Sequence, residues 1–455
     1  MSTTSYQEHI ATLQARYANA MVHFNLDAII VAAGDKSYYF QDDHTAPFHA
    51  YSGAQQWLPF TLSSETYLVI QAGKKPCLIW PVRDDFWHAP NPVPAGEWQN
   101  EWDISLARIE DKCFSNLPQK CAWLGPKPQS LAQTVEGLNA YVDFSKAVKT
   151  PFEINAMRLA TERAVKGHRV AKEAFLAGMS ELDIHLAFLQ ASQQTAVQEP
   201  YPGIVGINKH AAVLHYEHKD IMRPTNPLSL LIDAGASEHG YASDITRTFV
   251  HHNDEFSALV NSLDTMEQTL VKKALSGVDY RHLHQETLVG IAHILHDHKI
   301  CRLLPDEQLV KGIPQVFFPH GTGHLLGLQV HDVGGFQVDE LGTIRKDETA
   351  PFLRLTRTLK ENMVITIEPG LYFIPMLLEK MQADIPQHGC DLGLIKQLKP
   401  YGGIRIEDNI VVKNNVPINL TRDEFQKTVT NKNRHSKISG TGCITGDVLP
   451  LKLND

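Results

Sequence analysis

Two aspartates beside apolar segments are the first residues whose types and spacing suggest chemistry. Asp233 ends the apolar run L-S-L-L-I-D, and Asp244 lies eleven residues later, with Gly235 and Gly240 in the connection. An ionised carboxylate at the end of an apolar strand is costly unless a positive charge meets it. Two such carboxylates on a predicted hairpin therefore suggest a bound cation, although each could instead cap a turn.

A segment rich in glycine and histidine, from Pro319 to Gly335, is the strongest local signal. It reads P-H-G-T-G-H-L-L-G-L-Q-V-H-D-V-G-G and holds three histidines and five glycines in seventeen residues. His320 and His324 have the four-residue step of a zinc-protease helix, but glycines between them disfavour a helix and no Glu follows His320. The spacing also fails the dinucleotide-binding pattern. We interpret the segment as a turn or strand that brings imidazoles close to a ligand or another backbone.

Two glutamates complete a possible ligand set. In I-T-I-E, Glu368 shares a strand face with Thr366, and in I-R-I-E, Glu407 shares a face with Arg405. For either strand alone, a solvated outer sheet face is the simpler interpretation. The whole set, however, is rich in hard oxygen donors and suits Mn²⁺, Co²⁺ or a related divalent ion. Its members are Asp233, Asp244, His324, Glu368 and Glu407.

The elements that must position these residues fall into two regions. Short apolar runs at 28–33, 66–70 and 77–81, with helix-like stretches between others, predict a mixed α/β region. Near residue 150 a helix start is predicted, because Thr150 can cap it, Pro151 suits its first position and Glu153 can complete a capping box. We therefore expect a first domain at 1–149.

The second region predicts antiparallel strands interleaved with helices, which makes the fold class α+β. Its predicted strands lie at 228–233, 243–250, 363–368 and 403–412. After Asp423 the chain becomes polar, with little periodicity. We expect a catalytic domain at 150–423 and a loosely attached polar tail at 424–455.

Composition excludes several classes of protein. The chain is 43% hydrophobic and 20% charged, which is typical of a globular protein. Its 455 residues are too many for a single hydrophobic core. The formal net charge of −9 gives no overall attraction to nucleic acid or anionic lipid. No apolar stretch reaches membrane-spanning length, and the six scattered cysteines form no metal-finger spacing or disulfide framework. These features predict a cytoplasmic protein with reduced thiols, without nucleic-acid or membrane partners.

Longer motifs around the candidate ligands carry a family resemblance. The chain resembles the pita-bread metallopeptidases over about residues 5–423, and it is most similar to the bacterial Xaa-Pro dipeptidase (prolidase) group and the related organophosphorus acid anhydrolases. The motifs that carry it are H-A-A-V-L-H-Y (210–216), I-D-A-G-A (232–236), S-D-I-T-R-T-F (243–249), the histidine-rich segment above, L-R-L-T-R (353–357), T-I-E-P-G-L-Y-F (366–373) and G-G-I-R-I-E-D-N (402–409). A weaker likeness covers F-Q-D-D-H-T-A-P-F (40–48), where Thr45 and Ala46 depart from the usual pattern.

This resemblance implies a creatinase/prolidase-like N-terminal α/β domain, a pita-bread catalytic domain with a curved antiparallel sheet, and two divalent ions per chain. Mn²⁺ is the expected ion, with Co²⁺ or Zn²⁺ as alternatives. The matches to Asp244 and Glu407 bridge both ions, Asp233 chelates one, and His324 and Glu368 complete the other. A hydroxide between the ions would be the nucleophile at neutral pH. Glu368 would pass its proton to the proline nitrogen.

The resemblance also implies the residues that bind substrate. His215 and His331 would flank the oxyanion and the substrate. Guanidinium groups recognise a carboxylate well, and the resemblance places Arg354 and Arg405 at the C-terminal carboxylate. Arg405 could instead only neutralise Glu407. Tyr201 would lie near the leaving group, although plain packing is the alternative. Asp43, or its neighbour Asp42, would reach the substrate amine across a dimer.

The expected function is metal-dependent hydrolysis of Xaa-Pro dipeptides by a homodimer, with a possible side activity on organophosphate triesters and fluorides. Two rivals share the fold: an aminopeptidase P acting on longer Xaa-Pro peptides, and a pita-bread binding protein without catalysis. A metal-free relative such as creatinase lacks the ligand set, whereas this chain retains all five residues.

Overall fold

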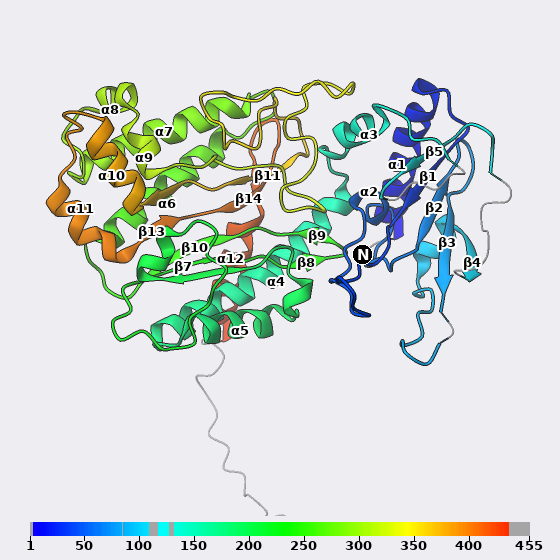
Figure 1. The fold of residues 1–455 in the computed structure, drawn as a ribbon, viewed down its shortest axis with the longest axis horizontal. Coiled ribbons are helices and arrows are strands. Elements are labelled where there is room, and N and C mark those ends of the chain that lie inside the picture. Colours follow the sequence, from blue (N-terminus) through cyan, green and yellow to red (C-terminus); the bar gives the residue numbers. More distant parts are fainter. Residues whose placement is uncertain (1–2, 84, 109–116, 127–131, 436–455) are drawn as a thin grey trace, which may run out of the picture.

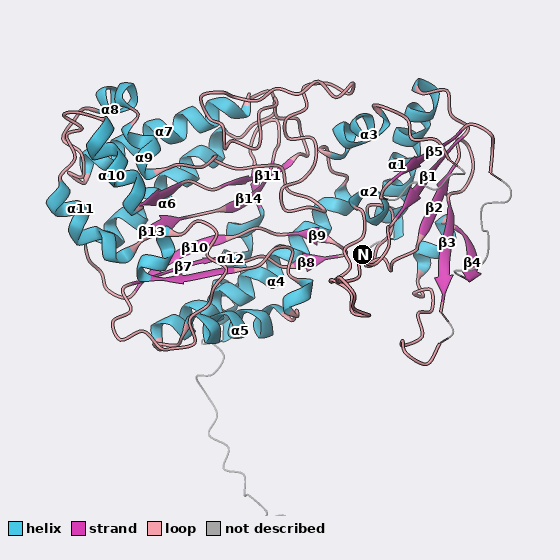
Figure 2. Cartoon of the chain, viewed as in Figure 1, coloured by secondary structure: helices cyan, strands magenta, loops and turns pink. Residues whose placement is uncertain are grey.

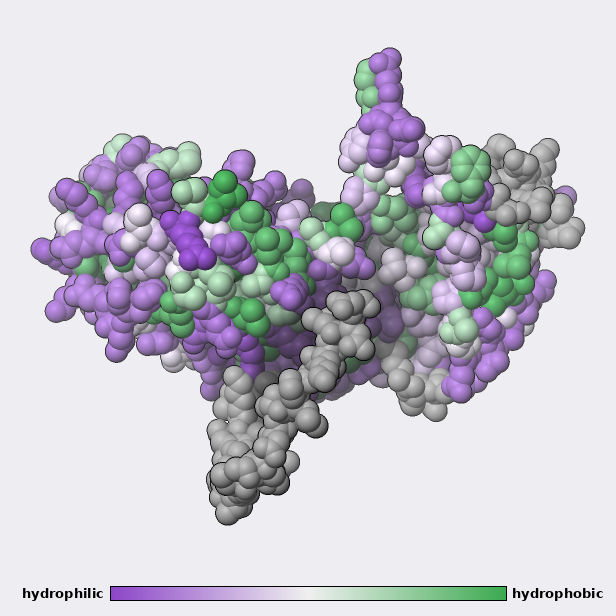
Figure 3. Space-filling view, turned by 90° about the horizontal axis from the view of Figure 1, so that it is seen from below, coloured by the Kyte–Doolittle hydropathy of each residue, from purple (hydrophilic) through white to green (hydrophobic). Residues whose placement is uncertain are grey.

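Two lobes make up the molecule in the computed structural model, which describes residues 3–83, 85–108, 117–126 and 132–435 (Figure 1). Figure 2 shows strands and helices in both lobes. A recess separates the lobes in the space-filling view, and apolar residues are visible on the surface of both (Figure 3).

The N-terminal lobe contains one five-stranded mixed sheet. Strands β1 and β5 are parallel, as are β3 and β4, while β2 is antiparallel to both of its neighbours. The predicted strands at 28–33, 66–70 and 77–81 are confirmed as β1, β2 and β3. The sheet order is β4-β3-β2-β1-β5. The elements are α1 (Thr3–His23), β1 (Ala28–Ala32), α2 (Ser52–Gln55), β2 (Tyr67–Ile70), β3 (Cys77–Val82), η1 (Glu97–Glu101), β4 (Asp103–Arg108), β5 (Cys121–Leu124) and α3 (Leu138–Lys146).

The junction between the lobes is a buried polar network at the start of α4 (Pro151–Leu176). The predicted capping box is confirmed: the Glu153 N–H donates to Thr150 Oγ1 at 3.3 Å, and the Thr150 N–H donates to Glu153 Oε2 at 2.7 Å. From α1, His9 Nδ1 lies 2.8 Å from Thr150 Oγ1. Gln56 donates to Glu153 Oε1 at 3.0 Å, and Tyr241 donates to the same oxygen at 2.9 Å. The cap of one helix therefore also joins the two lobes.

The strands of the C-terminal lobe pair antiparallel throughout, as predicted. They form the sheets β10-β7-β6, β11-β14-β15, β12-β13 and β8-β9. Their bounds are β6 (Ile204–Ile207), β7 (Ser229–Asp233), β8 (Ser237–Glu238), β9 (Tyr241–Ala242), β10 (Thr246–Val250), β11 (Val364–Ile367), β12 (Gly370–Tyr372), β13 (Gly403–Arg405), β14 (Asp408–Val411) and β15 (Ile418–Asn419).

Helices pack against these sheets through apolar side chains. Ala164 of α4 and Phe188 of α5 share an apolar cluster with Ile232 of β7, and α4 and α5 lie along β7 in Figure 1. Phe256 of α6 and Leu371 of β12 belong to a second cluster. The remaining bounds are α5 (Glu181–Ser192), η2 (Ala196–Gln198), η3 (Asn208–Ala212), α6 (Glu255–Lys273), α7 (Tyr280–Asp297), α8 (Pro305–Lys311), α9 (Ile313–Phe317), α10 (Pro375–Asp384), α11 (Leu392–Leu398), η4 (Lys399–Tyr401) and α12 (Leu420–His435).

The predicted strand at 403–412 is divided into β13 and β14 by Ile406 and Glu407. Glu407 forms an isolated antiparallel bridge with Thr246 of β10, and its N–H donates to the Thr246 carbonyl at 3.1 Å. A second bridge pairs Leu325 with Ile365 of β11. These two bridges connect the histidine-rich segment and three sheets into one continuous surface.

The C-terminal boundary differs from the sequence prediction. Helix α12 runs through the limit predicted at residue 423, so the first residues expected in a loose tail are helical. Arg422 of α12 forms ion pairs with Asp264 and with the buried Glu267 and Asp408. Arg169 of α4 donates to the carbonyl of Phe425. These long-range contacts anchor a segment whose composition is polar.

Candidate metal centre

Asp233 and Asp244 lie on facing ends of one hairpin. Asp233 is the last residue of β7 and pairs in register with Thr246 of β10, while the buried Asp244 precedes β10. The Tyr201 hydroxyl lies 2.8 Å from Asp233 Oδ1 and 2.5 Å from Asp244 Oδ1. A phenol has one proton to donate, so Tyr201 satisfies only one carboxylate at a time. Asp244 is fixed from behind because its N–H donates to Asn409 Oδ1 at 2.9 Å.

His324 presents one ring nitrogen to these carboxylates. Its Nδ1 lies 2.9 Å from the Leu325 carbonyl, which places the proton on Nδ1 and leaves Nε2 free to bind a metal. Nε2 lies 3.3 Å from Asp244 Oδ2 and 3.6 Å from Glu368 Oε1. The close packing of this segment on β11 explains one glycine of the motif, since a Cβ at Gly323 would lie 2.2 Å from the Thr366 carbonyl oxygen.

Glu368 and Glu407 approach from the ends of two further strands. Glu368 follows β11 directly, and its N–H donates to the Thr322 carbonyl at 2.8 Å. Glu407 Oε2 accepts a hydrogen bond from Thr246 Oγ1 at 2.6 Å. Ligand atoms of Asp244, His324 and Glu407 all lie within 4.8 Å of one another. The structure thus brings the sequence-predicted ligands of three sheets to one place.

The electrostatics of this cluster suit cations. Burial, followed by the charge of Asp233, raises the pKa of Asp244 well above its usual range. Burial also raises the pKa of Glu368 and of Glu407. For each of them, the charge of a neighbouring carboxylate is the next largest cause. Burial lowers the pKa of His324 to about 4, so this ring is neutral and ready to act as a ligand. Carboxylates packed together in this way are stabilised by divalent ions, and four carboxylates with one imidazole fit hard divalent metals.

Arg405 is committed to the ligand cluster. It is 4% exposed, and its Nη2 forms an ion pair with Asp233 Oδ2 at 2.7 Å. Its Nη1 donates to the Tyr372 hydroxyl at 2.8 Å, and its Nε donates to Thr246 Oγ1 at 3.2 Å. This geometry favours the structural alternative considered for Arg405, with Asp233 as the neutralised partner in place of Glu407.

A cavity of about 840 Å³ opens above the cluster. His215, His331 and Arg354 are all exposed, and they line it together with the five candidate ligands, Tyr201 and Arg405. The His331 and His324 rings meet edge to face, with centroids 4.4 Å apart. Within the described residues, the Arg354 side chain has no ion pair or hydrogen bond, so its guanidinium is available to a ligand.

Comparisons with known proteins decide the family. A family model described as Metallopeptidase family M24 matches residues 155–414, which is more than half of the chain. The chain belongs to metallopeptidase family M24. A second family model, described as Xaa-Pro dipeptidase, N-terminal domain, matches residues 4–141.

Similar proteins agree with M24 membership. The chain is 41% identical over 429 residues to an Xaa-Pro dipeptidase of Xanthomonas campestris pv. campestris (strain B100), covering 92% of this chain and 97% of that protein. An Xaa-Pro dipeptidase of Stenotrophomonas maltophilia (strain K279a) is 39% identical with the same coverage. Zinc-substituted aminopeptidase P of Escherichia coli has a TM-score of 0.69 at 22% identity, covering 93% and 96% of the two chains. Proline aminopeptidase P II from Yersinia pestis has a TM-score of 0.68 at 21% identity, covering 93% and 97%. These structural likenesses support the pita-bread fold of M24.

The segment that carries His215 is held to the M24 lobe by one buried carboxylate. Glu181, at the start of α5, accepts hydrogen bonds from the Ile207 N–H at 2.8 Å and from the Tyr216 hydroxyl at 2.8 Å. It also accepts from the Asp220 N–H at 2.8 Å and contacts His210 Nδ1 at 2.7 Å. The four partners lie on both sides of His215 in the sequence, so Glu181 fixes the loop at both ends.

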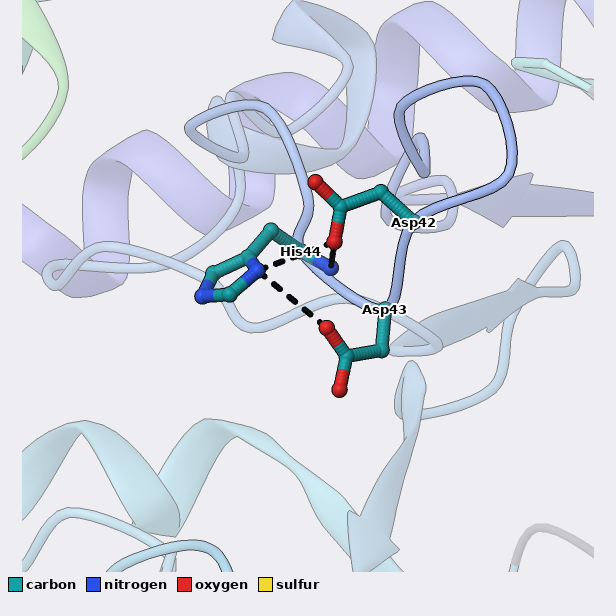
Figure 4. Close-up of side chains that lie close together, drawn as sticks. All are labelled: Asp42, Asp43 and His44. Carbon is teal, nitrogen blue, oxygen red and sulfur yellow. Dashed lines mark hydrogen bonds and ion pairs between the residues drawn. The ribbon is translucent and has the colours of Figure 1, made fainter.

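Asp43 lies outside the cavity above the candidate ligands of its own chain. Figure 4 shows Asp42 and Asp43 turned toward His44 in a loop of the N-terminal lobe. The Asp43 side chain is 95% exposed and its Oδ1 lies 3.2 Å from His44 Nδ1. Asp43 does not line the cavity. A single chain therefore does not bring this residue to the candidate ligands.

Two residues of the site, His320 and Tyr372, were not given a role by sequence reasoning. His320 Nε2 lies 2.8 Å from the Tyr372 hydroxyl, which in turn accepts a hydrogen bond from Arg405. His320 Nδ1 lies 3.7 Å from Glu368 Oε2, and His320 lines the cavity. Both residues lay in motifs that carried the family resemblance. One signal in the sequence could have indicated Tyr372. Its polar hydroxyl lies in an otherwise apolar strand, four residues after Glu368.

Proposed function

We propose that the five converging side chains hold two divalent ions and that the chain hydrolyses Xaa-Pro dipeptides. The observation that carries this proposal is the cluster of four buried or half-buried carboxylates and a neutral imidazole at the floor of an open cavity. Curated relatives about 40% identical over 92% of the chain are named Xaa-Pro dipeptidase, and the N-terminal lobe matches the domain of that name. Both findings support dipeptide hydrolysis over the activities of other family members.

The donor set supports Mn²⁺ as the resident ion, with Co²⁺ or Zn²⁺ as alternatives. We assign five residues as ligands: Asp233, Asp244, His324, Glu368 and Glu407 would hold the two ions. When bound, such a metal pair lowers the pKa of water and polarises the carbonyl that is attacked. Arg405 orients the carboxylate of Asp233, because its Nη2 donates a hydrogen bond to Oδ2, and Tyr201 holds Asp233 or Asp244 with its one proton.

Glu368 is assigned as the general acid and base. Its half-buried carboxyl lies at the cavity wall, where a carboxylate can accept a proton and return it. Glu368 accepts a proton from the attacking water and delivers it to the proline nitrogen. His215 and His331, at the cavity mouth, are assigned to the substrate and to the negative charge that develops on its carbonyl oxygen. Tyr201 is assigned to the leaving-group side of the cavity.

Arg354 is assigned to the free carboxylate of the substrate. It lines the cavity, is exposed and has no charged partner within the part of the chain that the structure describes. A planar guanidinium can bind a carboxylate through two hydrogen bonds. A dipeptide places its carboxylate one residue beyond the cleaved bond, so this contact selects short substrates.

We further propose a homodimer in which Asp43 of one chain meets the substrate ammonium of the other. Asp43 is exposed, charged and remote from its own cavity, which supports an action on a second copy.

The net charge of −9 supports the absence of a nucleic-acid partner. Within the described residues, no helix combines the length and apolar character needed to span a membrane. A cytoplasmic location and hydrolysis of organophosphates stay predictions.

One experiment tests the proposed function. Purified protein is stripped with a chelator, reloaded with Mn²⁺, Co²⁺ or Zn²⁺, and assayed on an Xaa-Pro dipeptide, an Xaa-Pro-Xaa tripeptide and a fluorophosphate. We expect two bound ions per chain and metal-restored cleavage of the dipeptide, with Asp244→Asn inactive. Faster cleavage of the tripeptide would indicate an aminopeptidase P, and no cleavage of any substrate would indicate a binding protein. Full activity after exhaustive chelation would contradict the metal assignment.

A further inference from the structure

Two cysteines far apart in the sequence face each other across a short antiparallel pairing in the C-terminal lobe. Cys301 follows α7 and Cys390 precedes α11, and they form an isolated β-bridge. The Arg302 N–H donates to the Gly389 carbonyl at 2.9 Å, and the Asp391 N–H donates to the Ile300 carbonyl at 2.9 Å. These bonds lie on either side of the cysteines, so the cysteines occupy a non-hydrogen-bonded position of the pairing.

That position suits a disulfide bond. Directly opposed residues at a non-hydrogen-bonded site have Cα atoms about 4.5 Å apart and side chains on the same face. Disulfides span Cα separations of roughly 4.4 to 6.8 Å, so no backbone movement is required. Both sulfurs lie beside the same carbonyl oxygen: Cys301 Sγ lies 3.5 Å and Cys390 Sγ lies 3.7 Å from that of His388.

The surroundings also support reaction between the two sulfurs. Both cysteines are free thiols in this structure. A hydrogen bond from the Cys390 thiol lowers the pKa of Cys301 to about 7, which increases its thiolate fraction. Cys301 is fully buried, whereas Cys390 is 9% exposed, so a very small oxidant is needed to reach the pair. Neither cysteine lines the cavity above the candidate ligands.

We propose that Cys301 and Cys390 are an oxidation site at which hydrogen peroxide forms a reversible cross-strand disulfide. The Cys301 thiolate attacks one peroxide oxygen, the O–O bond breaks, and the protonated products are a sulfenic acid and one water. The Cys390 sulfur then attacks the Cys301 sulfur, the S–O bond breaks, and the thiol proton leaves with the oxygen as a second water. Two thiols are oxidised by two electrons as one peroxide is reduced to two waters. A dithiol reverses the bond by thiol–disulfide exchange.

The disulfide would close a ring that contains part of the candidate metal centre. His324, Arg354 and Glu368 lie between the two cysteines in the sequence, while Asp233 and Glu407 lie outside. A covalent ring of this size restricts the unfolded chain and so stabilises the folded one. Because the cysteines lie apart from the cavity lining, we expect peroxide to raise thermal stability and to change turnover less than twofold.

The test uses the full-length protein with one equivalent of hydrogen peroxide, followed by blocking of remaining thiols and non-reducing peptide mass analysis. We expect a peptide pair joining Cys301 to Cys390, lighter by two hydrogens and lost on treatment with dithiothreitol, and loss of two of the six thiols. The Tm should rise by about 5 °C on oxidation. Cys390→Ser should abolish this rise, and Cys77→Ser, as a matched control, should keep it.

Three outcomes would overturn the proposal: both cysteines blocked as free thiols, either cysteine over-oxidised without a cross-link, or a cross-link to another cysteine. Peptide mapping of the unmodified protein decides between these outcomes even where Cys390→Ser fails to fold. The mapping is independent of catalysis, so its result is separate from that of the peptidase assay.

Discussion

The hydroxyl of Tyr201 illustrates how single residues at this site serve more than one partner. It lies within hydrogen-bond distance of Asp233 and of Asp244 but has one proton to give. Burial and the charges of these two carboxylates raise the pKa of Tyr201 well above its usual range, so the phenol stays protonated. The remaining negative charge of the pair must be met by other groups, of which Arg405 is one.

Arg354 gives the sharpest prediction at the residue scale. Replacing it by alanine leaves the substrate carboxylate without its partner. Arg354→Ala should therefore weaken transition-state stabilisation for an Xaa-Pro dipeptide by on the order of 2 to 4 kcal/mol, which lowers kcat/KM roughly 30- to 1000-fold. The same substitution should have a much smaller effect on the dipeptide amide, which has no carboxylate. Steady-state kinetics of both substrates provide the measurement.

Arg223→Ala is a suitable control for this comparison, because Arg223 is an exposed arginine that does not line the cavity. It should leave both substrates unaffected. Equal losses on the dipeptide and on its amide in Arg354→Ala would mean that Arg354 supports the cavity and not the substrate carboxylate.

At the scale of elements, one carboxylate fixes the loop that brings His215 to the cavity. Glu181→Ala would leave the buried N–H of Ile207 and the part-buried N–H of Asp220 without their acceptor. We expect the free energy of unfolding to fall by about 2 to 4 kcal/mol and kcat/KM to fall with it, because the segment carrying His215 loses its anchor. Urea denaturation and dipeptide kinetics measure the two effects.

Two variants bracket this prediction. Glu181→Gln keeps one acceptor oxygen and should fall between the parent and Glu181→Ala. Glu162→Ala removes an exposed glutamate whose ion pair with Lys166 joins residues four apart on α4, so it should cost less than about 0.5 kcal/mol. A Glu181→Ala protein with the stability and kinetics of Glu162→Ala would disprove the anchoring role.

The sequence predicted the elements whose signals are local. The start of α4 was predictable because Thr150, Pro151 and Glu153 carry out the capping within four residues. Four of the five candidate ligands were found because carboxylates at the ends of apolar strands are unusual in themselves, and His324 was found because its segment is rich in histidine and glycine. Their identity as a set, and the roles of the residues around them, came from the family resemblance.

Features set by long-range contacts were not predictable in the same way. The pairing of Arg405 with Asp233 joins residues 172 apart in the sequence. The single strand expected at 403–412 is divided because Glu407 bridges to Thr246 of another sheet. Helix α12 has a polar sequence, and Arg422 stabilises it through acidic partners on other elements. In each case the deciding partner is absent from the local pattern.

At the scale of the whole molecule, the proposed dimer can be tested by mixing chains. In a heterodimer of Asp43→Ala and Asp244→Asn chains, an action of Asp43 across the dimer leaves one site intact and the other lacking both residues. We therefore expect about half the parent activity per dimer. If Asp43 acts within its own chain, neither site is intact and activity near zero results. Separately tagged chains purified as the heterodimer allow this measurement.

The pH dependence of stability can be predicted from a buried histidine outside the ligand set. His168 is fully buried, its Nε2 lies 2.9 Å from the Ala234 carbonyl oxygen, and burial lowers its pKa to about 4. The unfolded chain binds this proton near pH 6.5, so stability is complete above that pH and is lost as the pH falls toward 4. His168 should account for about 2 kcal/mol of the loss between pH 7 and pH 5.

Urea denaturation of metal-free protein at both pH values measures this loss. His168→Gln cannot take up the proton, so it should lose less stability over the same interval, whatever its stability at pH 7. An identical pH dependence in the two proteins would exclude His168 as a source of acid sensitivity.

The spread of the candidate ligands along the chain also bears on how the enzyme acquires its ions during biosynthesis. Asp233 and Glu407 come from separate sheets, and roughly 170 residues lie between them. Ribosomes add about 5 to 20 residues per second, so the last ligand follows the first by on the order of 10 to 30 s. Throughout that interval the ligand set is incomplete, because Glu407 has not yet been added to the chain. The selection between competing ions is therefore made by the completed chain against the metals available in its compartment, and not by the nascent polypeptide.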